Sequence, residues 1–352
     1  MGKERNARYI ALMIAVMLSA AIIGMSATGA DGRAAAAAYE PKILIPGGKS
    51  VGIAMATEGV VVIGMSDVGE SKSPARAAGL KGGDVITAVN GVPVSTAQEL
   101  TDLLTDGERA QIDYTRGGDA HSAEVLPVRD GRDGRARIGA WVRTDTAGVG
   151  TLTYIDPATN DFGALGHAVA DVDTGVTLPL SEGAIYNSRV VQIERGQRGA
   201  PGEIVGDFIG GAEQIGDVTD NTDFGLFGSD YRGGTDDLPY ADGLPAAERS
   251  QIHTGSAQIL TTIDDRVRAF DCEIEHLSFG REPTMRSIVL HITDPELIER
   301  TGGIVQGMSG SPIVQDGRLV GAVTHVFVND PTRGYGICIG DMLTAAERER
   351  AA

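Results

Sequence analysis

The chain has 352 residues, of which 42% are hydrophobic and 5% aromatic, and it contains 49 glycines. This length allows two domains with separate cores, and many glycines with few aromatic residues favour a β-rich architecture. The formal net charge of −18 argues against nucleic-acid binding, which needs clustered Lys and Arg. Cys272 and Cys338 match no metal-ligand spacing; we expect two buried free thiols, with one disulfide as the alternative.

The N-terminal segment predicts export. Lys3, Arg5 and Arg8 precede an apolar stretch at residues 9–27, which is long enough for a signal peptide or a membrane span. The alanine run at residues 34–38 offers small-residue cleavage sites, and an uncleaved anchor is the alternative. Residues 1–38 are therefore interpreted as a signal or membrane anchor plus linker, which places the remaining chain outside the cytoplasm.

Residues 41–128 predict one compact α+β domain. The β-branched run at residues 59–64 is typical of a buried strand. Pro74 fits the first turn of a short helix, and Gly79 fits its left-handed end.

Residues 73–91 read Ser-Pro-Ala-Arg-Ala-Ala-Gly-Leu-Lys-Gly-Gly-Asp-Val-Ile-Thr-Ala-Val-Asn-Gly. With this run, residues 41–128 resemble a PDZ domain of the bacterial protease-associated type. The resemblance implies binding of an extended peptide, often a C-terminus, as an added strand at the sheet edge. The expected carboxylate-binding loop has the backbone N–H groups of Ser50, Val51, Gly52 and Ile53. A groove filled by the protein itself is the alternative.

Residues 138–345 predict a second, all-β domain after a charged connector at residues 129–137. Short β-prone runs are separated by Gly and Asp turns, at residues 148–155, 184–193, 287–292 and 319–328. The Asp- and Gly-rich segment 206–243 is interpreted as a solvated loop, with a cation-binding loop as the alternative.

A nucleophilic serine is predicted in the run from Gly307 to Pro312, which reads Gly-Met-Ser-Gly-Ser-Pro. A serine hydroxyl needs an exposed tight turn and a neighbouring base, and flanking glycines let the backbone bend sharply. The glycine spacing favours Ser309 over Ser311. It also makes the N–H groups of Gly307 and Ser309 the candidate oxyanion hole.

The candidate base is His167, because small residues surround it and leave room for a substrate. Asp171 and Asp173 follow closely and could orient the imidazole. The spacing His-x-x-x-Asp-x-Asp also allows a metal site, which is the competing interpretation. His325 follows a strand-like run and is assigned to the core or to a supporting position.

Three motifs together carry a family resemblance. They are Gly-Ala-Leu-Gly-His-x-x-x-Asp-x-Asp-Thr-Gly, Ile-Val-Gln-Gly-Met-Ser-Gly-Ser-Pro-Ile and Gly-Ala-Val-Thr-His-Val-Phe-Val-Asn-Asp-Pro. With them the chain resembles the stage IV sporulation protein B peptidases (SpoIVB) over nearly its whole length. The nucleophile turn also resembles that of chymotrypsin-like peptidases, except that Met308 replaces the usual Asp, so activation by a new N-terminus pairing with that Asp is not available.

The resemblance implies a chymotrypsin-like double β-barrel with His167 as general base, Ser309 as nucleophile and Asp294 as the residue that orients His167. It implies no cofactor or metal. Its expected substrate is a membrane-anchored regulator of an intramembrane metalloprotease, in the space between the forespore and mother-cell membranes. The cut would trigger late sigma-factor activation, and self-cleavage is expected. The alternatives are a quality-control protease of the HtrA kind, whose peptidase domain normally comes first, and a non-catalytic peptide-binding scaffold.

Overall fold

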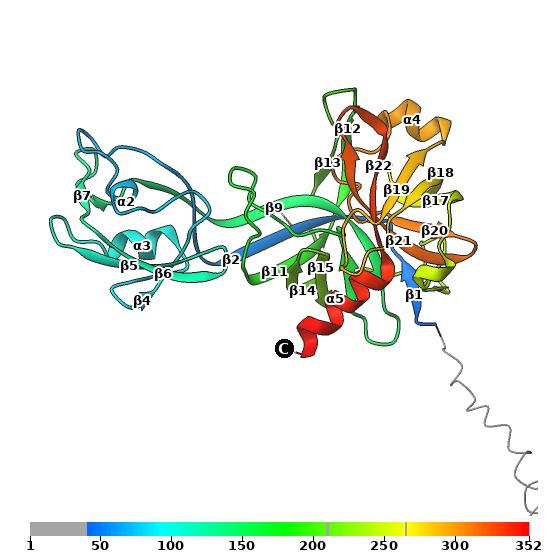
Figure 1. Cartoon of the computed structure of the whole chain (residues 1–352), viewed down its shortest axis with the longest axis horizontal. Helices are drawn as coiled ribbons and strands as arrows, with labels where there is room; N and C mark the ends of the chain where they lie inside the picture. The colour runs from blue at the N-terminus through cyan, green and yellow to red at the C-terminus, as the bar shows by residue number, and fades with distance from the viewer. Residues whose placement is uncertain (1–40, 209–210, 265, 352) are drawn as a thin grey trace, which may run out of the picture. The chain divides into compact units, whose positions relative to one another are not determined.

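The computed structural model describes residues 41–208, 211–264 and 266–351, and the fold is mainly β (Figure 1). Residues 42–352 form one compact unit. The predicted signal or anchor segment at residues 1–38 lies outside the described residues. Within the part of the chain that is described, no helix is long and apolar enough to cross a membrane.

Six strands close a first β-barrel, which we call barrel 1. In order of hydrogen-bonded neighbours they are β9 (Ala140–Ile155), β10 (Phe162–Ala164), β15 (Gly225–Ser229), β14 (Gln214–Thr222), β11 (Leu180–Asn187) and β2 (Ser50–Met65). The ring closes because β2 pairs with β9 as well as with β11. A short strand, β1 (Ile43–Pro46), adds to β9 and to β16 (Leu244–Pro245). Apolar side chains such as Leu152, Phe162 and Ile185 fill the interior.

Two strands of barrel 1 lie where the sequence predicted a solvated loop. β14 and β15 are part of the segment 206–243 and pair with each other as a hairpin. The prediction was wrong because only one face of β14 is apolar, where Ile215 and Val218 enter the core. A strand with one polar face in an Asp-rich segment gives a weak sequence signal. Within the described residues, no group of three metal-ligating side chains gathers here or elsewhere.

A smaller sheet with two short helices forms the PDZ module. It uses the second half of β2, β3 (Val85–Val89), β4 (Val92–Pro93), β5 (Ala110–Arg116), β6 (Asp119–Val125), α2 (Pro74–Ala77) and α3 (Ala97–Asp102). As predicted, α2 begins at Pro74, with Ser73 as its N-cap, and Gly79 takes a positive φ of 90°. Ile86 and Ile112 belong to a separate core. The pair β7 (Val128–Arg129) and β8 (Ala136–Arg137) precedes β9.

Strands β2 and β9 are shared by barrel 1 and the PDZ module. Residues 50–57 of β2 lie between β9 and β11, whereas Val60 and Val61 pair with β3 and residues 61–65 pair with the start of β9. Gly59 permits the change of register, because its φ is 84° and a Cβ there would lie 2.7 Å from the carbonyl oxygen of Ile86. The sequence assigned residues 41–57 to the PDZ domain, but the pairing shows that this stretch includes a barrel strand.

Six further strands close barrel 2. In order they are β17 (Gly255–Thr262), β18 (Val267–Leu277), β19 (Ile288–Ile292), β22 (Asp330–Cys338), β21 (Arg318–Phe327) and β20 (Pro312–Gln315), and β20 returns to β17. A 3-10 turn, η1 (Arg249–Gln251), precedes it; α4 (Pro295–Thr301) follows β19, and α5 (Ile339–Ala351) follows β22. Cys272 and Cys338 are buried free thiols, as predicted. The predicted double barrel with an added α+β module is confirmed.

One hairpin lies outside both barrels, formed by β12 (Arg189–Glu194) and β13 (Glu203–Asp207). Its second strand reaches the segment before the Ser309 turn, because Ile204 N–H donates to the Gln306 carbonyl and Gln306 N–H donates to that of Gly202. The hairpin therefore supports the turn from outside the barrels.

Candidate active site

The turn around Ser309 lies between α4 and β20 and is fixed by barrel 1. Gly307 and Gly310 have positive φ values of 93° and 96°, which L side chains rarely adopt. On β9, Thr151 donates from its N–H to the Ser309 carbonyl at 3.0 Å and from its hydroxyl to the Gly307 carbonyl at 2.7 Å. A Cβ on Gly310 would lie 2.5 Å from the Leu165 nitrogen, so the turn and barrel 1 are too close here for any side chain.

Two N–H groups of this turn are available to a ligand. The N–H groups of Met308, Gly310 and Ser311 donate to backbone carbonyls. Those of Gly307 and Ser309 donate no hydrogen bond within the described residues. They are the two groups expected for the oxyanion hole, and that role stays a prediction.

Burial distinguishes the two serines of the turn. Ser309 is partly exposed, and its hydroxyl donates to the Thr324 carbonyl at 2.9 Å. Ser311 is fully buried, and its hydroxyl has no partner. Only Ser309 can therefore meet a substrate.

His167 follows β10 and faces barrel 2. Leu165 and Gly166, both with positive φ, turn the chain so that a Cβ on Gly166 would lie 3.0 Å from Thr324 Cγ2. Nδ1 of His167 is 2.8 Å from the Ala168 carbonyl oxygen, which can only accept, so Nδ1 carries the proton and Nε2 is free as a base. Burial lowers the pKa of His167, and the hydrogen bond to Ala168 opposes this only in part. The imidazole is therefore neutral at pH 7.

Ser309 and His167 both lie beside β21, but their side chains are not hydrogen-bonded to each other in the described structure. Both are connected to β21: the hydroxyl of Ser309 donates to the carbonyl of Thr324, and the ring of the next residue, His325, has its centre 5.2 Å from that of His167. The sequence analysis left two places open for His325, in the core or in a supporting position.

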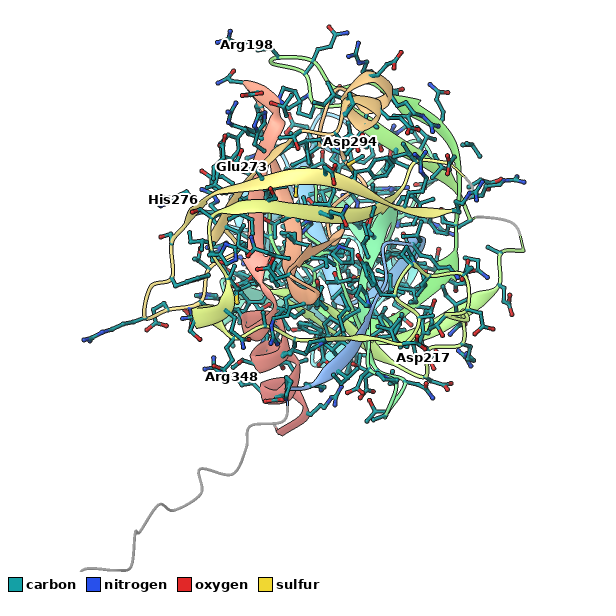
Figure 2. All side chains as sticks on the ribbon, turned by 90° about the vertical axis from the view of Figure 1, so that its right-hand side faces the viewer. Arg198, Asp217, Glu273, His276, Asp294 and Arg348 are labelled. Carbon is teal, nitrogen blue, oxygen red and sulfur yellow. The ribbon has the colours of Figure 1, made fainter. Side chains whose placement is uncertain are left out.

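Asp294 is not brought to His167, which corrects the expectation that it orients the base. It is the N-cap of α4, where one carboxylate oxygen accepts from the Leu297 N–H at 3.0 Å and the other from the Asp271 N–H at 3.5 Å. Figure 2 shows Asp294 beside this helix. An Asp-Pro pair before a helix is a common start signal, and here that local role accounts for the residue.

Asp171 and Asp173 also have partners other than His167. Both bind the guanidinium of Arg143 on β9, and Asp171 accepts from the N–H and hydroxyl of Thr174. Burial alone would raise the pKa of Asp171, but these hydrogen bonds and the Arg143 charge lower it overall. The two carboxylates therefore fix the loop that follows His167, and within the described residues they form no metal-binding group with it.

The predicted PDZ carboxylate loop is wrong. Val51, Gly52 and Ile53 each have a strand partner on both sides, from β9 and from β11, and Ser50 is buried at the start of the same strand. Their N–H groups lie within barrel 1 and cannot receive a peptide carboxylate. The resemblance placed a loop at these residues, whereas their pairing with β9 and β11, which come much later in the chain, makes them a strand.

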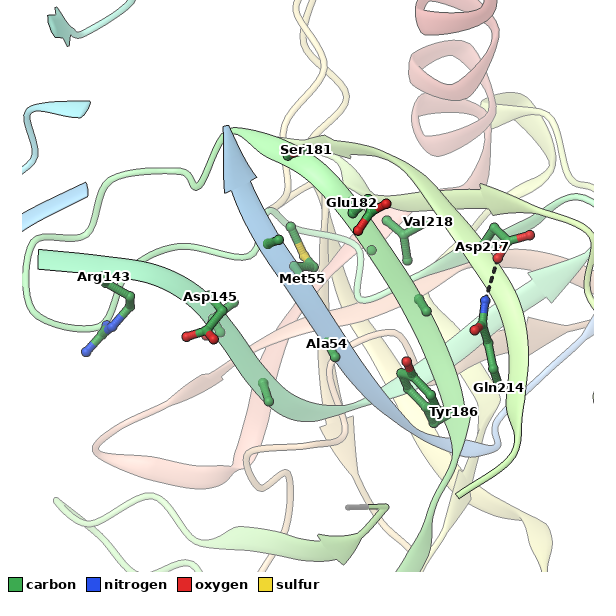
Figure 3. Close-up of a pocket in the computed structure, with 15 residues that line it drawn as sticks. Ala54, Met55, Arg143, Asp145, Ser181, Glu182, Tyr186, Gln214, Asp217 and Val218 are labelled. Atoms are coloured by element: carbon green, nitrogen blue, oxygen red, sulfur yellow. Dashed lines mark hydrogen bonds between the residues drawn. The ribbon is translucent and has the colours of Figure 1, made fainter. Parts of the chain in front are cut away.

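An open hollow of about 920 Å³ lies on the outer face of barrel 1 (Figure 3). Its lining includes Arg143, Asp145, Glu182 and Asp217, together with small side chains of β2 and β11. Neither Ser309 nor His167 is among the residues that line it.

Comparisons with known proteins identify both parts of the chain. A family model described as SpoIVB peptidase S55 matches residues 134–343, and a PDZ domain model matches residues 47–126. The zinc metalloprotease RasP of Shouchella clausii is 37% identical over 123 residues, which are 31% of this chain and 28% of that protein. A putative zinc metalloprotease of Neisseria meningitidis is 40% identical over 60 residues, 16% of this chain and 14% of that protein. The chain thus spans less than a third of either relative.

Two solved structures are similar in part. The active form of the Rv3671c protease from M. tuberculosis is 13% identical, with a TM-score of 0.31, and the match covers 56% of this chain and 72% of that one. The PDZ domain of the SdrC-like protein from Listeria monocytogenes is 27% identical, with a TM-score of 0.21, and covers 24% of this chain and 87% of that one.

Proposed function

Because this chain belongs to the SpoIVB peptidase S55 family, and is therefore a serine peptidase of a sporulation family, we propose that it makes a regulatory cut in another protein during endospore formation. Its substrate is a membrane-anchored regulator of an intramembrane metalloprotease, and the cut leads to activation of a late sigma factor. The same site cleaves the chain itself. Family membership supports these assignments, and the PDZ domain adds a module that binds extended peptides.

The observation that carries the proposal is the Ser309 turn, with a partly exposed hydroxyl beside two N–H groups that donate to no described residue. In the reaction, Ser309 Oγ attacks the carbonyl carbon of the scissile bond while its proton passes to Nε2 of His167. The N–H groups of Gly307 and Ser309 donate to the oxyanion. His167 then protonates the leaving amine, and water releases the acyl group by the same proton transfers.

The hydrogen bond from Ser309 to the Thr324 carbonyl describes a resting state. One hydroxyl hydrogen cannot serve Thr324 and His167 together, so attack requires Oγ to turn toward His167. We expect a bound peptide to stabilise that rotamer, since catalytic hydrogen bonds often form only in the substrate complex.

The proposed location is the space between the forespore and mother-cell membranes, with the N-terminal segment as signal or anchor. The basic residues and apolar stretch within residues 1–27 support export. The partial likeness to the zinc metalloprotease RasP supports a link between this chain and a metalloprotease pathway.

The test compares Ser309→Ala with Ser311→Ala in the full-length chain. Labelling by a fluorophosphonate probe and intact-mass analysis report nucleophilicity, self-cleavage and removal of residues 1–38 together. We expect Ser309→Ala to abolish labelling and self-processing while the protein still folds. Ser311→Ala removes only a buried hydroxyl without a partner, so it is expected to behave like the wild type.

Two outcomes would reject the proposal. Processing that survives Ser309→Ala would place the nucleophile elsewhere. A wild-type chain that resists the probe but still binds peptides would favour the non-catalytic scaffold.

A further inference from the structure

The geometry leaves His167 without a carboxylate partner. Asp294 caps α4, and Asp171 and Asp173 bind Arg143. The Nδ1 proton of His167 meets only the carbonyl of its own neighbour, Ala168. A general base of a serine peptidase is normally oriented by a third side chain that accepts this proton, so the identity of that side chain is open.

His325 on β21 occupies the place where such a side chain is needed. Its ring centre is 5.2 Å from that of His167, with an angle of 41° between the planes. A hydrogen bond of about 2.9 Å between two ring nitrogens separates the ring centres by about 5 Å, so the separation observed suits such a pair once Nδ1 of His167 turns from the Ala168 carbonyl to His325. Nδ1 of His325 is buried and has no partner among the described residues, although buried polar atoms are rarely left unpaired.

We propose that His325 is the positioning residue of this active site: its unpartnered ring nitrogen accepts the Nδ1 proton of His167 and holds the base toward Ser309. The inference rests on the proposed role of His167. During attack, the proton of Ser309 Oγ moves to Nε2 of His167, and the resulting imidazolium donates its Nδ1–H to neutral His325. His325 gains no proton, so the step balances without a further group.

The surroundings keep His325 in the accepting, neutral form. Burial, the neighbouring His167 and the guanidinium of Arg286 lower the pKa of His325 to about 4. Besides these, Tyr335 is the partner of His325 on the neighbouring strand, and the Ser309 hydroxyl binds the carbonyl of the preceding residue, Thr324. A second proton on the pair would place two positive charges side by side, so the two histidines are expected to titrate as one coupled system.

A neutral acceptor stabilises an imidazolium less than a carboxylate does. We therefore expect His167 to be a weaker base, which stays neutral below pH 6.5 and reacts more slowly. This suits an enzyme that makes a single regulatory cut.

The test uses three substitutions of His325 in the full-length chain, with exposed His276 on β18 as the matched control (Figure 2). The measured quantity is the rate of fluorophosphonate labelling as a function of pH. We expect His325→Leu to slow labelling at least about tenfold and His325→Gln, which keeps an acceptor oxygen, to slow it less. We expect His325→Glu to move the acidic limb of the profile upward by about one pH unit, because a carboxylate raises the pKa of His167. His276→Leu should change neither quantity.

A purely structural role would not move the acidic limb. Labelling of His325→Leu within about twofold of wild type would overturn the proposal. So would an unchanged acidic limb in His325→Glu.

A second measurement decides the matter if these variants do not fold. The six histidines are labelled with carbon-13 in Ser309→Ala, and His167 is titrated by NMR with and without His325→Gln. A shift of the His167 titration supports the pair, and an unchanged curve overturns it. This readout needs no activity, so an inert wild type would reject the proposed function while the titration still decides on the histidine pair.

Discussion

Replacing Asp294 separates the two roles open to this carboxylate, because capping and orientation predict effects of very different size. As the N-cap of α4, Asp294 accepts from the Leu297 N–H, and an asparagine oxygen can do the same. Asp294→Asn then loses only the negative charge at the helix N-terminus, about 0.3–1 kcal/mol of folding free energy. Asp294→Ala loses the cap as well, about 0.5–2 kcal/mol.

A residue that orients the catalytic histidine behaves differently. Its conversion to the amide lowers kcat by about 10⁴ even when the geometry is kept. At about 1.4 kcal/mol for each factor of ten, this is about 5.5 kcal/mol of transition-state stabilisation. The cap cannot produce such a loss in a folded protein.

The assay combines fluorophosphonate labelling rates with thermal unfolding of the same preparations. We expect Asp294→Asn to be labelled within about twofold of wild type. We expect Asp294→Ala to lower the melting temperature by a few degrees, at about 2–4 °C per kcal/mol for a domain of this size, and to keep its labelling rate below that temperature. A folded Asp294→Asn protein that is labelled about a thousandfold more slowly would refute the argument and restore Asp294 as the orienting residue.

Two further predictions concern the base and the loop that follows it. Asn221 on β14 binds both the N–H and the carbonyl of Val169 and the carbonyl of Leu178, so Asn221→Leu should lower unfolding free energy by about 1–3 kcal/mol in urea titrations and slow labelling. The reverse result, wild-type stability with wild-type labelling, would show that these hydrogen bonds do not fix the loop. The pKa values of His167 and His325 are lower in the folded chain than in the unfolded chain. As pH falls from 6.5 toward 4, the unfolded chain therefore binds more protons than the folded chain. Stability is therefore fully present above pH 6.5 and declines below it, and His325→Gln should flatten the decline in melting temperature measured across this range.

Local chemistry made part of the site predictable. The positive φ values of Gly307 and Gly310 are what the spacing of glycines around Ser309 suggested, and the start of α2 at Pro74 follows from proline's fixed φ. Such features depend on a few neighbouring residues, so the sequence contains the information needed to predict them.

Features that depend on distant partners were predicted less well. The sequence interpretation made Ser50 to Ile53 a ligand-binding loop, and only the pairing with β9 and β11 shows that they form a strand of barrel 1. Asp294 stands where a motif suggested catalysis, yet its carboxylate accepts from Leu297 in the helix that it caps and from Asp271 on β18. The importance of His325 depends on a ring that lies 158 positions earlier in the chain, which no local pattern reveals.

The strand β9 is what brings the nucleophile and the base into one site. Thr151, near its end, holds the carbonyls of Ser309 and Gly307, whereas Arg143, near its start, holds Asp171 and so the loop after His167. Residues 145–151 of β9 pair with β2 in one register, and the register shifts before Arg143, which pairs with Val61. Because a paired strand cannot slide by one residue without exchanging its two faces, the register of each stretch fixes the contact that is made from it. The same two strands continue beyond the shift into the PDZ module, so the PDZ module and the active site share β2 and β9.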